Sequence, residues 1–456
     1  MDFSSVAAIS TPYGRGAIAV IRISGEDAIQ VLERVFVPSS GKTLSDYRPS
    51  QLIRGDIVSG GMQIDDGMAV FFKAPGSYTG ENSAEIYCHG GILVSEEVLK
   101  AVFAAGASPA EPGEFTRRAF INGKLGLTEA EAIINTIDAE TKDKLELARS
   151  HRRGVLSSKI QGIYKRLLSL VSSVYVFADY PDEDLSDISP EEMSAALREI
   201  LKETVDLGAT YKMGQAINEG IYTVLTGRPN TGKSSLLNLL LGSERAIVSD
   251  TAGTTRDSIE ETVALGRMLL RLCDTAGIRE GRDEIERLGI ERSLSALDRA
   301  GLVIAVFDGS NEATQEDMRV CEIVSALRCA KIAVINKSDL PRKLTLDTSA
   351  FDKTVLMSAK YAESSADIAK EIESLFITGE IDYDCDAIVA SARQRASLDR
   401  ATAAIESAID VLDSGYTPDV AGLDIEQAMS ALGEIDGRSV SEDIVRDIFG
   451  RFCVGK

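Results

Sequence analysis

The sequence predicts a multidomain protein in which an α/β domain is inserted into an α-helical bundle that follows an α+β domain. Three observations predict this architecture. A glycine-rich loop at 227–234 separates an apolar run from a helical run. On both sides of that region, apolar residues recur at the helical spacings of three and four. The first 118 residues instead mix alternating, strand-like runs with short helical stretches.

The α/β domain is predicted first from its phosphate loop. The apolar run Ile221–Leu225 leads into Gly-Arg-Pro-Asn-Thr-Gly-Lys-Ser (227–234), and the helical run Ser235–Leu241 follows. This is the G-x-x-x-x-G-K-[ST] pattern between a strand and a helix, where backbone N–H groups and the positive helix end meet phosphate oxygens. Lys233 is expected to reach the β- and γ-phosphates, and the Ser234 hydroxyl to bind Mg²⁺.

Three further motifs each follow an apolar run: Asp274–Gly277 after Met268–Cys273, Asn336–Asp339 after Lys331–Ile335, and Ser358–Lys360 after Thr354–Met357. Sheets of α/β proteins bind ligands at the carboxyl ends of their strands, so four motifs at four strand ends indicate one site. The Asp339 carboxylate can accept two N–H bonds from guanine, a pair that adenine cannot supply, and Asn336 can read a base edge. We therefore interpret residues 217–378 as a GTP-binding domain, an α/β P-loop GTPase of the Ras-like type.

Composition limits the other classes of function. The chain has 456 residues and a net charge of −22, which argues against a broad nucleic-acid groove, because phosphate binding needs clustered Lys and Arg. Any RNA contact must therefore be local or supplied by a partner. There is no long uncharged apolar run and no signal peptide, so we expect a cytoplasmic protein without a membrane contact. Six cysteines lie without C-x-x-C spacing, which argues against a zinc site or disulfides: 88, 273, 321, 329, 385 and 453.

The regions around the GTP-binding domain have different patterns. Residues 1–118 are expected to form the α+β domain, with a helix over Gly25–Phe36 among its strands. Residues 119–216 are expected to form the first half of a helical domain. Residues 379–456 form its second half, beginning with a helix over Ile388–Leu412. A GTP-binding domain between two helical stretches would be inserted into one bundle, so that its motions could be transmitted to the bundle.

Several polar residues have two interpretations. Arg22, Glu85 and His89 lie at or near strand ends, where a solvated or structurally paired side chain is the simpler interpretation. His89 follows a cysteine, but such a pair is no metal site without further ligands. The segment Ser40–Thr43 looks like a phosphate loop but lacks the upstream glycine and strand, so we expect a surface turn. Cys453 is either an ordinary thiol or part of a C-terminal tail that folds into a cleft.

A set of motifs spread along the chain carries a specific resemblance: 11–16, Arg22–Gly25, Tyr78–Glu81, His89–Gly91, Pro112–Phe120, Asn122–Lys124, Leu127–Ala132, 227–235, Gly253–Asp257, Asp274–Gly277 and Phe452–Lys456. Over essentially its whole length the chain resembles the MnmE (TrmE) family of tRNA-modification GTPases. The resemblance implies a homodimer joined through N-terminal domains that bind 5-formyl- or methylene-tetrahydrofolate. It also implies a flavoprotein partner, MnmG (GidA), in a heterotetrameric or larger complex, with tRNA bound mainly through that partner.

The resemblance further implies the reaction and the residues of the folate site. Family members and their partner install an aminomethyl or carboxymethylaminomethyl group on C5 of the wobble uridine of certain tRNAs. Arg22, Glu85, Lys124 and Lys456 match the folate-contacting residues by position, which replaces the simpler interpretation of Arg22 and Glu85. Cations suit the carboxylates of folate, and a carboxylate suits the N–H edge of the pterin. Cys453 matches a C-terminal cysteine that matters for modification.

GTP hydrolysis needs its own account, because Ile278 follows Asp274–Gly277 where many small GTPases have a water-positioning glutamine. Family members use a potassium ion and a more distant glutamate, and Glu286 matches that glutamate. Hydrolysis is expected to be coupled to contact between two GTP-binding domains. The residues expected to bind K⁺ are Asn230, Ser249, Thr251 and Thr254, and those expected to bind Mg²⁺ are Ser234 and Thr255. The full set expected to contact GTP is Asn230, Thr231, Gly232, Lys233, Ser234, Ser235, Ser249, Asp250, Thr251, Ala252, Gly253, Thr254, Thr255, Asp274, Thr275, Ala276, Gly277, Asn336, Lys337, Asp339, Ser358 and Ala359.

A second hypothesis comes from a different class, a switch GTPase of ribosome assembly similar to Era or Der. An RNA-binding KH-like domain after the GTP-binding domain would favour it. The C-terminal region is instead helical and acidic, with no G-x-x-G clamp in a basic setting. Binding of a reduced folate, which only the first hypothesis predicts, separates the two.

Overall fold

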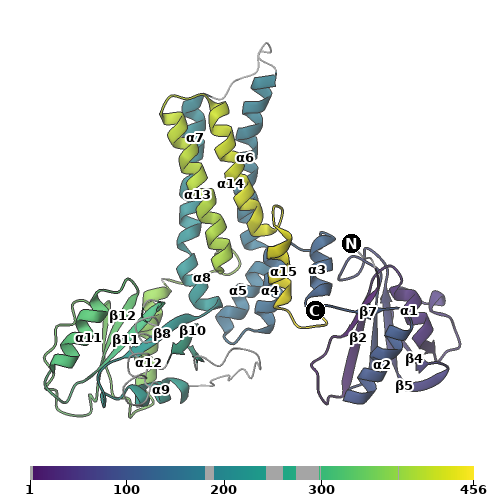
Figure 1. The fold of residues 1–456 in the computed structure, drawn as a ribbon, viewed down its shortest axis with the longest axis horizontal. Helices are drawn as coiled ribbons and strands as arrows, with labels where there is room; N and C mark the ends of the chain where they lie inside the picture. The colour runs from purple at the N-terminus through teal and green to yellow at the C-terminus, as the bar shows by residue number, and fades with distance from the viewer. Residues whose placement is uncertain (1–3, 180–188, 243–259, 274–296, 298, 378) are drawn as a thin grey trace, which may run out of the picture. The chain divides into compact units, whose positions relative to one another are not determined.

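The computed structural model describes residues 4–179, 189–242, 260–273, 297, 299–377 and 379–456. The chain forms two compact units, one of Met1–Ile134 with Asp436–Lys456 and the other of Asn135–Ile435. This division is coarser than the four predicted domains, whose limits remain predictions. Figure 1 shows the elements of each unit, which we describe separately.

The first unit is built on a seven-stranded, mainly antiparallel sheet. Its order is β3 (Phe36–Pro38), β4 (Ile53–Ser59), β5 (Met62–Phe72), β6 (Ser83–His89), β2 (Ile18–Ser24), β1 (Val6–Ile9) and β7 (Ser108–Pro109). Helices α1 (Ala28–Val35) and α2 (Ile92–Ala104) bury their apolar residues against Ile21, Ile23 and Ile57 in one core cluster. Val6 and Ala8 alternate with Ala7 along β1 and are buried in a second cluster with Phe115.

The predicted helix over Gly25–Phe36 is too long at both ends. Gly25 has a φ of 143°, a conformation that residues with a side chain rarely adopt, and a Cβ there would collide with Ser5. At the other end, Phe36 leaves the helix to pair with Ile57 as part of β3. Strand pairing therefore ends α1 at Val35, where the apolar pattern alone continued.

The C-terminal residues return to this first unit. Helix α15 (Glu442–Gly450) packs by Phe449 on Phe120 of α3 (Glu114–Ile121), with ring centroids 6.0 Å apart. Phe452 is buried in the same cluster. Val454 then forms an isolated antiparallel bridge with Pro112. The tail thus lies on the folded surface of the N-terminal unit, as the cleft interpretation of Cys453 requires.

The helical part of the second unit is a bundle of long helices. Figure 1 shows them side by side: α6 (Val155–Asp179), α7 (Pro190–Ala209), α13 (Ala392–Asp413) and α14 (Pro418–Asp436). Their common core buries a stripe of apolar residues that recur at the helical spacings of three and four: Ile160, Ile163, Leu167, Val171 and Val174. Two shorter helices, α5 (Lys142–Arg152) and α8 (Tyr211–Asn218), precede and follow the pair of α6 and α7. Helix α4 (Leu127–Ile137) belongs mostly to the first unit, which extends to Ile134, and Leu127 is buried there with Phe449.

The predicted helix over Ile388–Leu412 begins later than expected. Ser391 is extended and accepts a hydrogen bond from the Gln394 N–H, while the Gln394 side chain returns to the Ser391 N–H. This capping box satisfies N–H groups that have no partner inside the helix, so α13 starts at Ala392. Ile388 and Val389 lie in the non-helical segment before α13, and both are buried.

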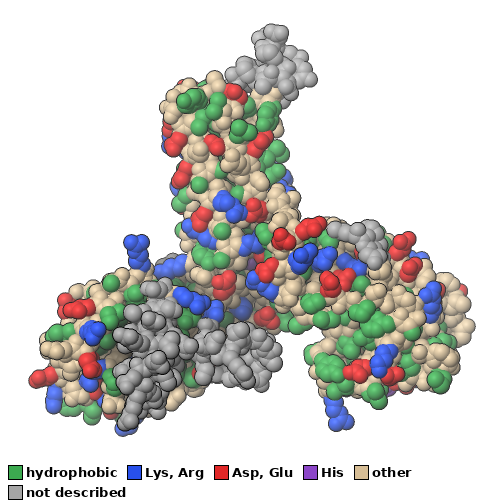
Figure 2. All heavy atoms as spheres, in the orientation of Figure 1, with side chains coloured by type: hydrophobic (Ala, Val, Ile, Leu, Met, Phe, Trp, Pro, Cys, Tyr) green, Lys and Arg blue, Asp and Glu red, His purple; other side chains and the backbone are tan. Residues whose placement is uncertain are grey.

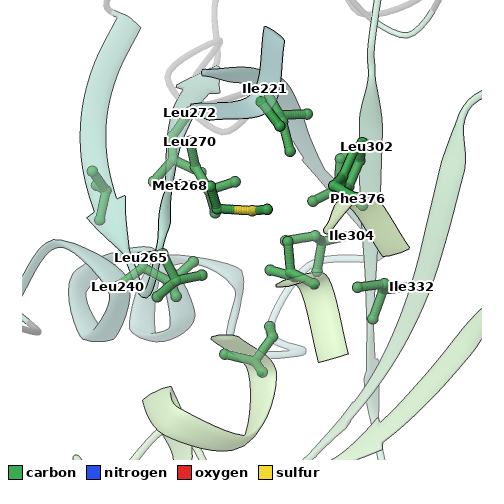
Figure 3. Packing of buried hydrophobic residues seen from close by; sticks show 14 of the residues in the cluster. Ile221, Leu240, Leu265, Met268, Leu270, Leu272, Leu302, Ile304, Ile332 and Phe376 are labelled. Atoms are coloured by element: carbon green, nitrogen blue, oxygen red, sulfur yellow. The ribbon is translucent and has the colours of Figure 1, made fainter. Parts of the chain in front are cut away.

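The second sheet carries the GTP-binding motifs. Its order is β13 (Lys353–Leu356), β12 (Ala330–Asn336), β11 (Leu302–Asp308), β8 (Ile221–Thr226), β10 (Met268–Cys273) and β9 (Glu260–Leu265), parallel except for β9. Helices α9 (Lys233–Gly242), α11 (Gln315–Ser325) and α12 (Ser364–Phe376) cover it. Figure 3 shows Met268 pointing into the core among apolar residues such as Ile221, Leu302 and Ile304.

The surface is charged and mixed. On the face shown in Figure 2, lysine and arginine side chains are interspersed with acidic ones rather than gathered in one broad basic field. None of the helices in the described part of the chain combines the length and apolarity that a bilayer crossing requires.

Candidate functional site

The phosphate loop begins where β8 ends and closes where α9 begins. Gly227 has a φ of 141°, and a Cβ there would collide with the Val306 carbonyl oxygen of β11. Gly232 has a φ of 95°, and a Cβ there would collide with the Asn336 amide nitrogen. Asn230 takes the left-handed conformation as well, with a φ of 64°. The loop therefore requires both glycines, and its tight turn directs backbone N–H groups inward as a phosphate cradle does.

Two cationic side chains, Lys233 and Arg228, hold this cradle. The Lys233 ammonium donates to the carbonyl oxygens of Gly227 and Arg228, both at 2.8 Å. The Arg228 guanidinium in turn contacts both carboxylate oxygens of Asp317 at 3.1 Å. Asp317 is almost fully buried and also caps α11 through Thr314. The loop is thus anchored to a helix start in the core of the domain.

Asn336 joins three of the predicted segments. Its side-chain nitrogen donates to the Thr231 carbonyl oxygen at 2.9 Å. Its side-chain oxygen accepts from the backbone N–H groups of Lys337, at 2.8 Å, and Ala359, at 2.9 Å. One buried amide therefore links the phosphate loop to both loops expected to surround the base. The structure brings these predicted residues together.

Asp339, predicted to accept the guanine edge, contacts the Ser358 motif. Its carboxylate accepts a hydrogen bond from the Ser358 hydroxyl at 2.7 Å. That bond lowers the pKa of Asp339, so the exposed carboxylate is ionised at neutral pH. An ionised carboxylate is an acceptor only, and it can receive the two N–H groups of a guanine edge.

Asp308 supports the same loop, and the sequence interpretation missed it. It ends β11, is 3% exposed, and binds the Lys337 ammonium at 2.6 Å. Burial alone would raise the pKa of Asp308, but hydrogen bonds from Lys337, Ser310 and Asn311 outweigh it and lower the pKa to about 2. The signal was present, because Asp308 follows an apolar run in the manner of the other motifs.

The predicted folate residues Arg22 and Glu85 are cross-strand partners on β2 and β6. The Arg22 guanidinium contacts one Glu85 oxygen at 2.9 and 3.0 Å, and the other Glu85 oxygen accepts from the Tyr87 hydroxyl at 2.7 Å. Burial and that hydrogen bond raise the pKa of Tyr87 to about 12. Arg22 also lies 5.7 Å from the ring centroids of Tyr78 and Phe115.

The other two predicted folate residues are placed differently. The Phe115 N–H donates to the Lys456 carbonyl oxygen at 3.1 Å, so the chain end lies beside the ring that contacts Arg22. The Ser10 hydroxyl holds the Gly455 carbonyl at 2.9 Å. The Lys124 ammonium instead donates to the Pro75 carbonyl oxygen at 2.9 Å. The structure thus pairs Arg22 with Glu85 and links the tail backbone to Phe115, whose ring lies near Arg22. It shows no contact of the Lys124 side chain with Arg22 in the described part of this unit.

Two family profiles match the chain. The profile of the MnmE helical domain covers residues 127–453, and that of the TrmE N-terminus, described as a GTP-binding protein, covers residues 5–124. The tRNA modification GTPase MnmE of Geobacillus kaustophilus (strain HTA426) is 38% identical over the full length of both chains. The protein of the same name from Heliobacterium modesticaldum (strain ATCC 51547 / Ice1) is 40% identical over 99% of both. The chain belongs to the MnmE family.

Membership in the MnmE family decides between the two hypotheses. With its phosphate cradle and guanine loops, this MnmE-family chain is a GTP hydrolase. A solved structure of Era from Aquifex aeolicus shares 25% identity over 40% of this chain and 65% of that chain, with a TM-score of 0.27, a partial likeness from which nothing further follows. The described residues after the GTP-binding domain form helices, with no strand of a KH-like domain among them. The hypothesis of a ribosome-assembly GTPase is therefore not supported.

Part of the predicted hydrolytic apparatus of this MnmE-family chain lies outside the described residues. This holds for Ser249–Thr255, for Asp274–Gly277 and for Glu286. Their assignments as ligands of Mg²⁺ and K⁺ and as the residue that orients water stay predictions. Of the predicted metal ligands, Asn230 and Ser234 are described, and both are exposed on the loop.

Sequence reasoning assigned no role to Arg118, although its motif carried the MnmE resemblance. The guanidinium, 12% exposed, contacts Glu81 at 3.0 Å and Glu114 at 2.8 Å and reaches the Ser24 carbonyl. It thereby ties α3 to the loop before β6. Glu114 lies four residues before Arg118 on the same helix, but only the fold reveals the pair with Glu81, which lies 37 residues away.

Two simpler interpretations agree with the structure. His89 is paired: its Nδ1 lies 2.8 Å from an Asp65 oxygen, and that contact raises its pKa. Asp66 lies near the pair, and ligand atoms of all three lie within 4.8 Å of one another, but the side chains are already held by hydrogen bonds of their own or exposed to solvent. Ser40–Thr43 is an exposed turn, as predicted.

Proposed function

We propose that this GTP hydrolase modifies C5 of the wobble uridine of certain tRNAs to the aminomethyl or carboxymethylaminomethyl form, together with the flavoprotein MnmG. The matched full-length relatives are named tRNA modification GTPases, which supports tRNA as the substrate. One observation carries the proposal. The same chain combines a phosphate loop that Asn336 links to the Ser358 motif with an Arg22–Glu85 pair close to Phe115, the residue whose N–H donates to the C-terminal carbonyl.

We propose that a reduced folate, 5-formyl- or methylene-tetrahydrofolate, binds at the Arg22–Glu85 pair and supplies the transferred carbon. The pair fits such a ligand. One Glu85 oxygen contacts two Arg22 nitrogens and the other accepts from Tyr87, and a carboxylate offers about four acceptor positions, so capacity remains on the second oxygen for an N–H group of a pterin edge. Arg22, Lys124 and Lys456 would hold the carboxylates of the ligand.

For hydrolysis, the cradle residues have defined tasks. Lys233 and the loop N–H groups hold the phosphates, and Ser234 with Thr255 would hold Mg²⁺. Asn230, held in the left-handed conformation with an exposed side chain, would hold K⁺ with Ser249, Thr251 and Thr254, a donor set of oxygens that suits a hard cation. K⁺, when bound there, would supply positive charge that offsets the charge developing on the phosphates. Glu286 would orient the attacking water.

The proposed assembly follows from the same reasoning. Two chains would associate through their N-terminal units, and contact between their GTP-binding domains would complete the potassium loops. MnmG would join this homodimer in a heterotetrameric or larger complex in the cytoplasm.

Calorimetry with 5-formyl-tetrahydrofolate tests the proposal on the full-length chain. We expect Arg22→Gln to weaken binding by roughly 10- to 100-fold, because it removes a hydrogen bond to charged groups worth about 1.5–3 kcal/mol. Arg54→Gln, which removes an exposed charge from β4 of the same unit, is the matched control and should bind as the wild type does. Arg22→Lys keeps the charge and should recover part of the affinity. A wild-type chain that binds no folate would refute the assignment.

A further inference from the structure

The second unit contains a cavity of about 720 Å³ that is distinct from the GTP site. Four basic residues line it: Lys212, Arg271, Arg299 and Arg328. They come from four places in the chain, namely α8, β10, the segment before β11 and the segment after α11. Their convergence is therefore a property of the fold and not of a basic run in the sequence.

The cavity lies at the amino ends of the parallel strands, whereas the phosphate cradle lies at their carboxyl ends. It is lined by Ile221 and Tyr222 at the start of β8, by Gly301 just before β11 and by Ala330 at the start of β12. The cradle begins at Gly227, after the end of β8. At about 3.3 Å per residue, the length of this strand puts the two sites roughly 17 Å apart.

The charges of the cavity are mostly uncompensated. Glu219 is the one carboxylate among its described lining residues, and it already accepts a hydrogen bond from the Gln215 amide at 3.3 Å. No ion pair joins Lys212, Arg299 or Arg328 to a carboxylate in the part of the chain that the structure describes. Exposed arginines elsewhere in this protein commonly have such a partner, as Arg153 does in Asp384.

Aromatic rings hold two of these cations without neutralising them. The Lys212 ammonium lies 4.9 Å from the Phe376 ring centroid, and the Arg299 guanidinium lies 5.6 Å from that of Tyr222. A cation on a ring face keeps its full charge and its N–H donors. Both side chains are therefore partly ordered and still available to an anion.

The chemistry of this cavity suits phosphate groups. Guanidinium groups bind phosphate oxygens in pairs, and an ammonium binds them as a point charge. The net charge of −22 would repel a polyanion from most of the surface. At physiological ionic strength, however, such charges act over only about 8 Å, so a local group of four cations can still attract one.

We propose that this cavity binds backbone phosphates of the tRNA substrate, an inference that rests on the proposed function. Free nucleotides are usually held by backbone N–H groups at a helix start or a glycine-rich turn. Here long, exposed side chains on the rim provide the donors, as is typical of contacts that follow an RNA backbone. The cavity thus gives this chain an RNA contact of its own, beside any that a partner supplies.

The test measures binding of a fluorescent tRNA transcript to the full-length chain by anisotropy over a series of salt concentrations. The double variant Arg299→Gln with Arg328→Gln removes two charges from the cavity. Arg319→Gln with Arg342→Gln removes two exposed charges from the same domain outside it, as a matched control. Unchanged melting temperatures show that both variants fold, and Arg299→Lys with Arg328→Lys keeps the charge.

We expect the cavity variant to bind tRNA roughly tenfold more weakly, and its plot of log affinity against log salt to be shallower by about 1.5, since each phosphate contact contributes about 0.7–0.9. The control should match the wild type, and the lysine variant should keep most of the salt dependence. Equal losses in the cavity variant and the control would overturn the inference. So would a second equivalent of bound GDP that the cavity variant alone loses, because the ligand would then be a free nucleotide. A wild-type chain that binds no tRNA also overturns it, while folate binding would still support the proposed function.

Discussion

Replacing Asp308 by Asn tests how the guanine loop is stabilised. Asp308 is 3% exposed and holds the Lys337 ammonium at 2.6 Å. Its pKa falls from 3.8 to about 2. A shift of roughly 2 units corresponds to about 2.5 kcal/mol in favour of the ionised form in the folded protein. We therefore expect Asp308→Asn to lower the free energy of unfolding of the GTP-binding domain by about 2–3 kcal/mol at pH 7.

The pH dependence gives a second, independent signature. The pKa of Asp308 is lower in the folded state than the value of about 3.9 in an unfolded chain, so its stabilisation is fully present above about pH 4 and is lost as the pH falls toward 2. By pH 3, roughly half of it remains. The difference in stability between the wild type and Asp308→Asn should therefore be constant from pH 5 to 7 and smaller by about 1.2 kcal/mol at pH 3.

Urea unfolding followed by the fluorescence of bound methylanthraniloyl-GDP reports on this domain alone at neutral pH, and hydrogen exchange of β11 amides extends the series to pH 3. The chain has no tryptophan, so the nucleotide signal is free of that background. Asp347→Asn, which removes an exposed carboxylate from the same domain, is the matched control and should change stability by less than about 0.5 kcal/mol. Equal effects of the two variants, or a difference independent of pH, would refute the reasoning.

Three further predictions concern the reaction. Replacing K⁺ by Na⁺ should lower GTP turnover, by as much as roughly 10³-fold if K⁺ acts as an arginine finger does, while GDP affinity changes little; Asn230→Ala should lower turnover in K⁺, and equal wild-type turnover in both salts would contradict the potassium assignment. Glu286→Ala should reduce kcat in steady-state assays with GDP affinity intact, and a large loss of affinity would point to a structural role instead. Cys453→Ser should spare GTP hydrolysis but abolish tRNA modification in cells, and wild-type levels of modified uridine would make the thiol incidental.

The sequence was sufficient wherever a local rule decides the structure. The strand Ile221–Leu225 and the helix after the phosphate loop are confirmed, because the apolar run, the glycines and the helical spacing all agree. The start of α7 follows a local rule as well, since Ser189 and Glu192, three residues apart, form a capping box. In each case the residues that decide the structure are neighbours in the chain.

The sequence was insufficient where distant residues decide. The ends of α1 depend on Gly25 packing against Ser5 and on the pairing of Phe36 with Ile57. Arg118 pairs with Glu81, 37 residues away, and Asp308 pairs with Lys337, 29 residues away, so only the fold shows these two ion pairs. The helix predicted from Ile388 shows the same limit. Ile388 and Val389 are buried as expected, but they lie in a non-helical segment and not on a helix face.

Mass spectrometry of wobble uridines tests the central claim most directly. Cells lacking this chain would be complemented with the wild type or with Lys233→Ala, or left without complementation. The nucleosides of their purified tRNAs would then be quantified. We predict modified uridine only with the wild type, because Lys233 holds the phosphates on which the reaction cycle depends. Modified uridine at wild-type levels in cells without the chain would contradict the account.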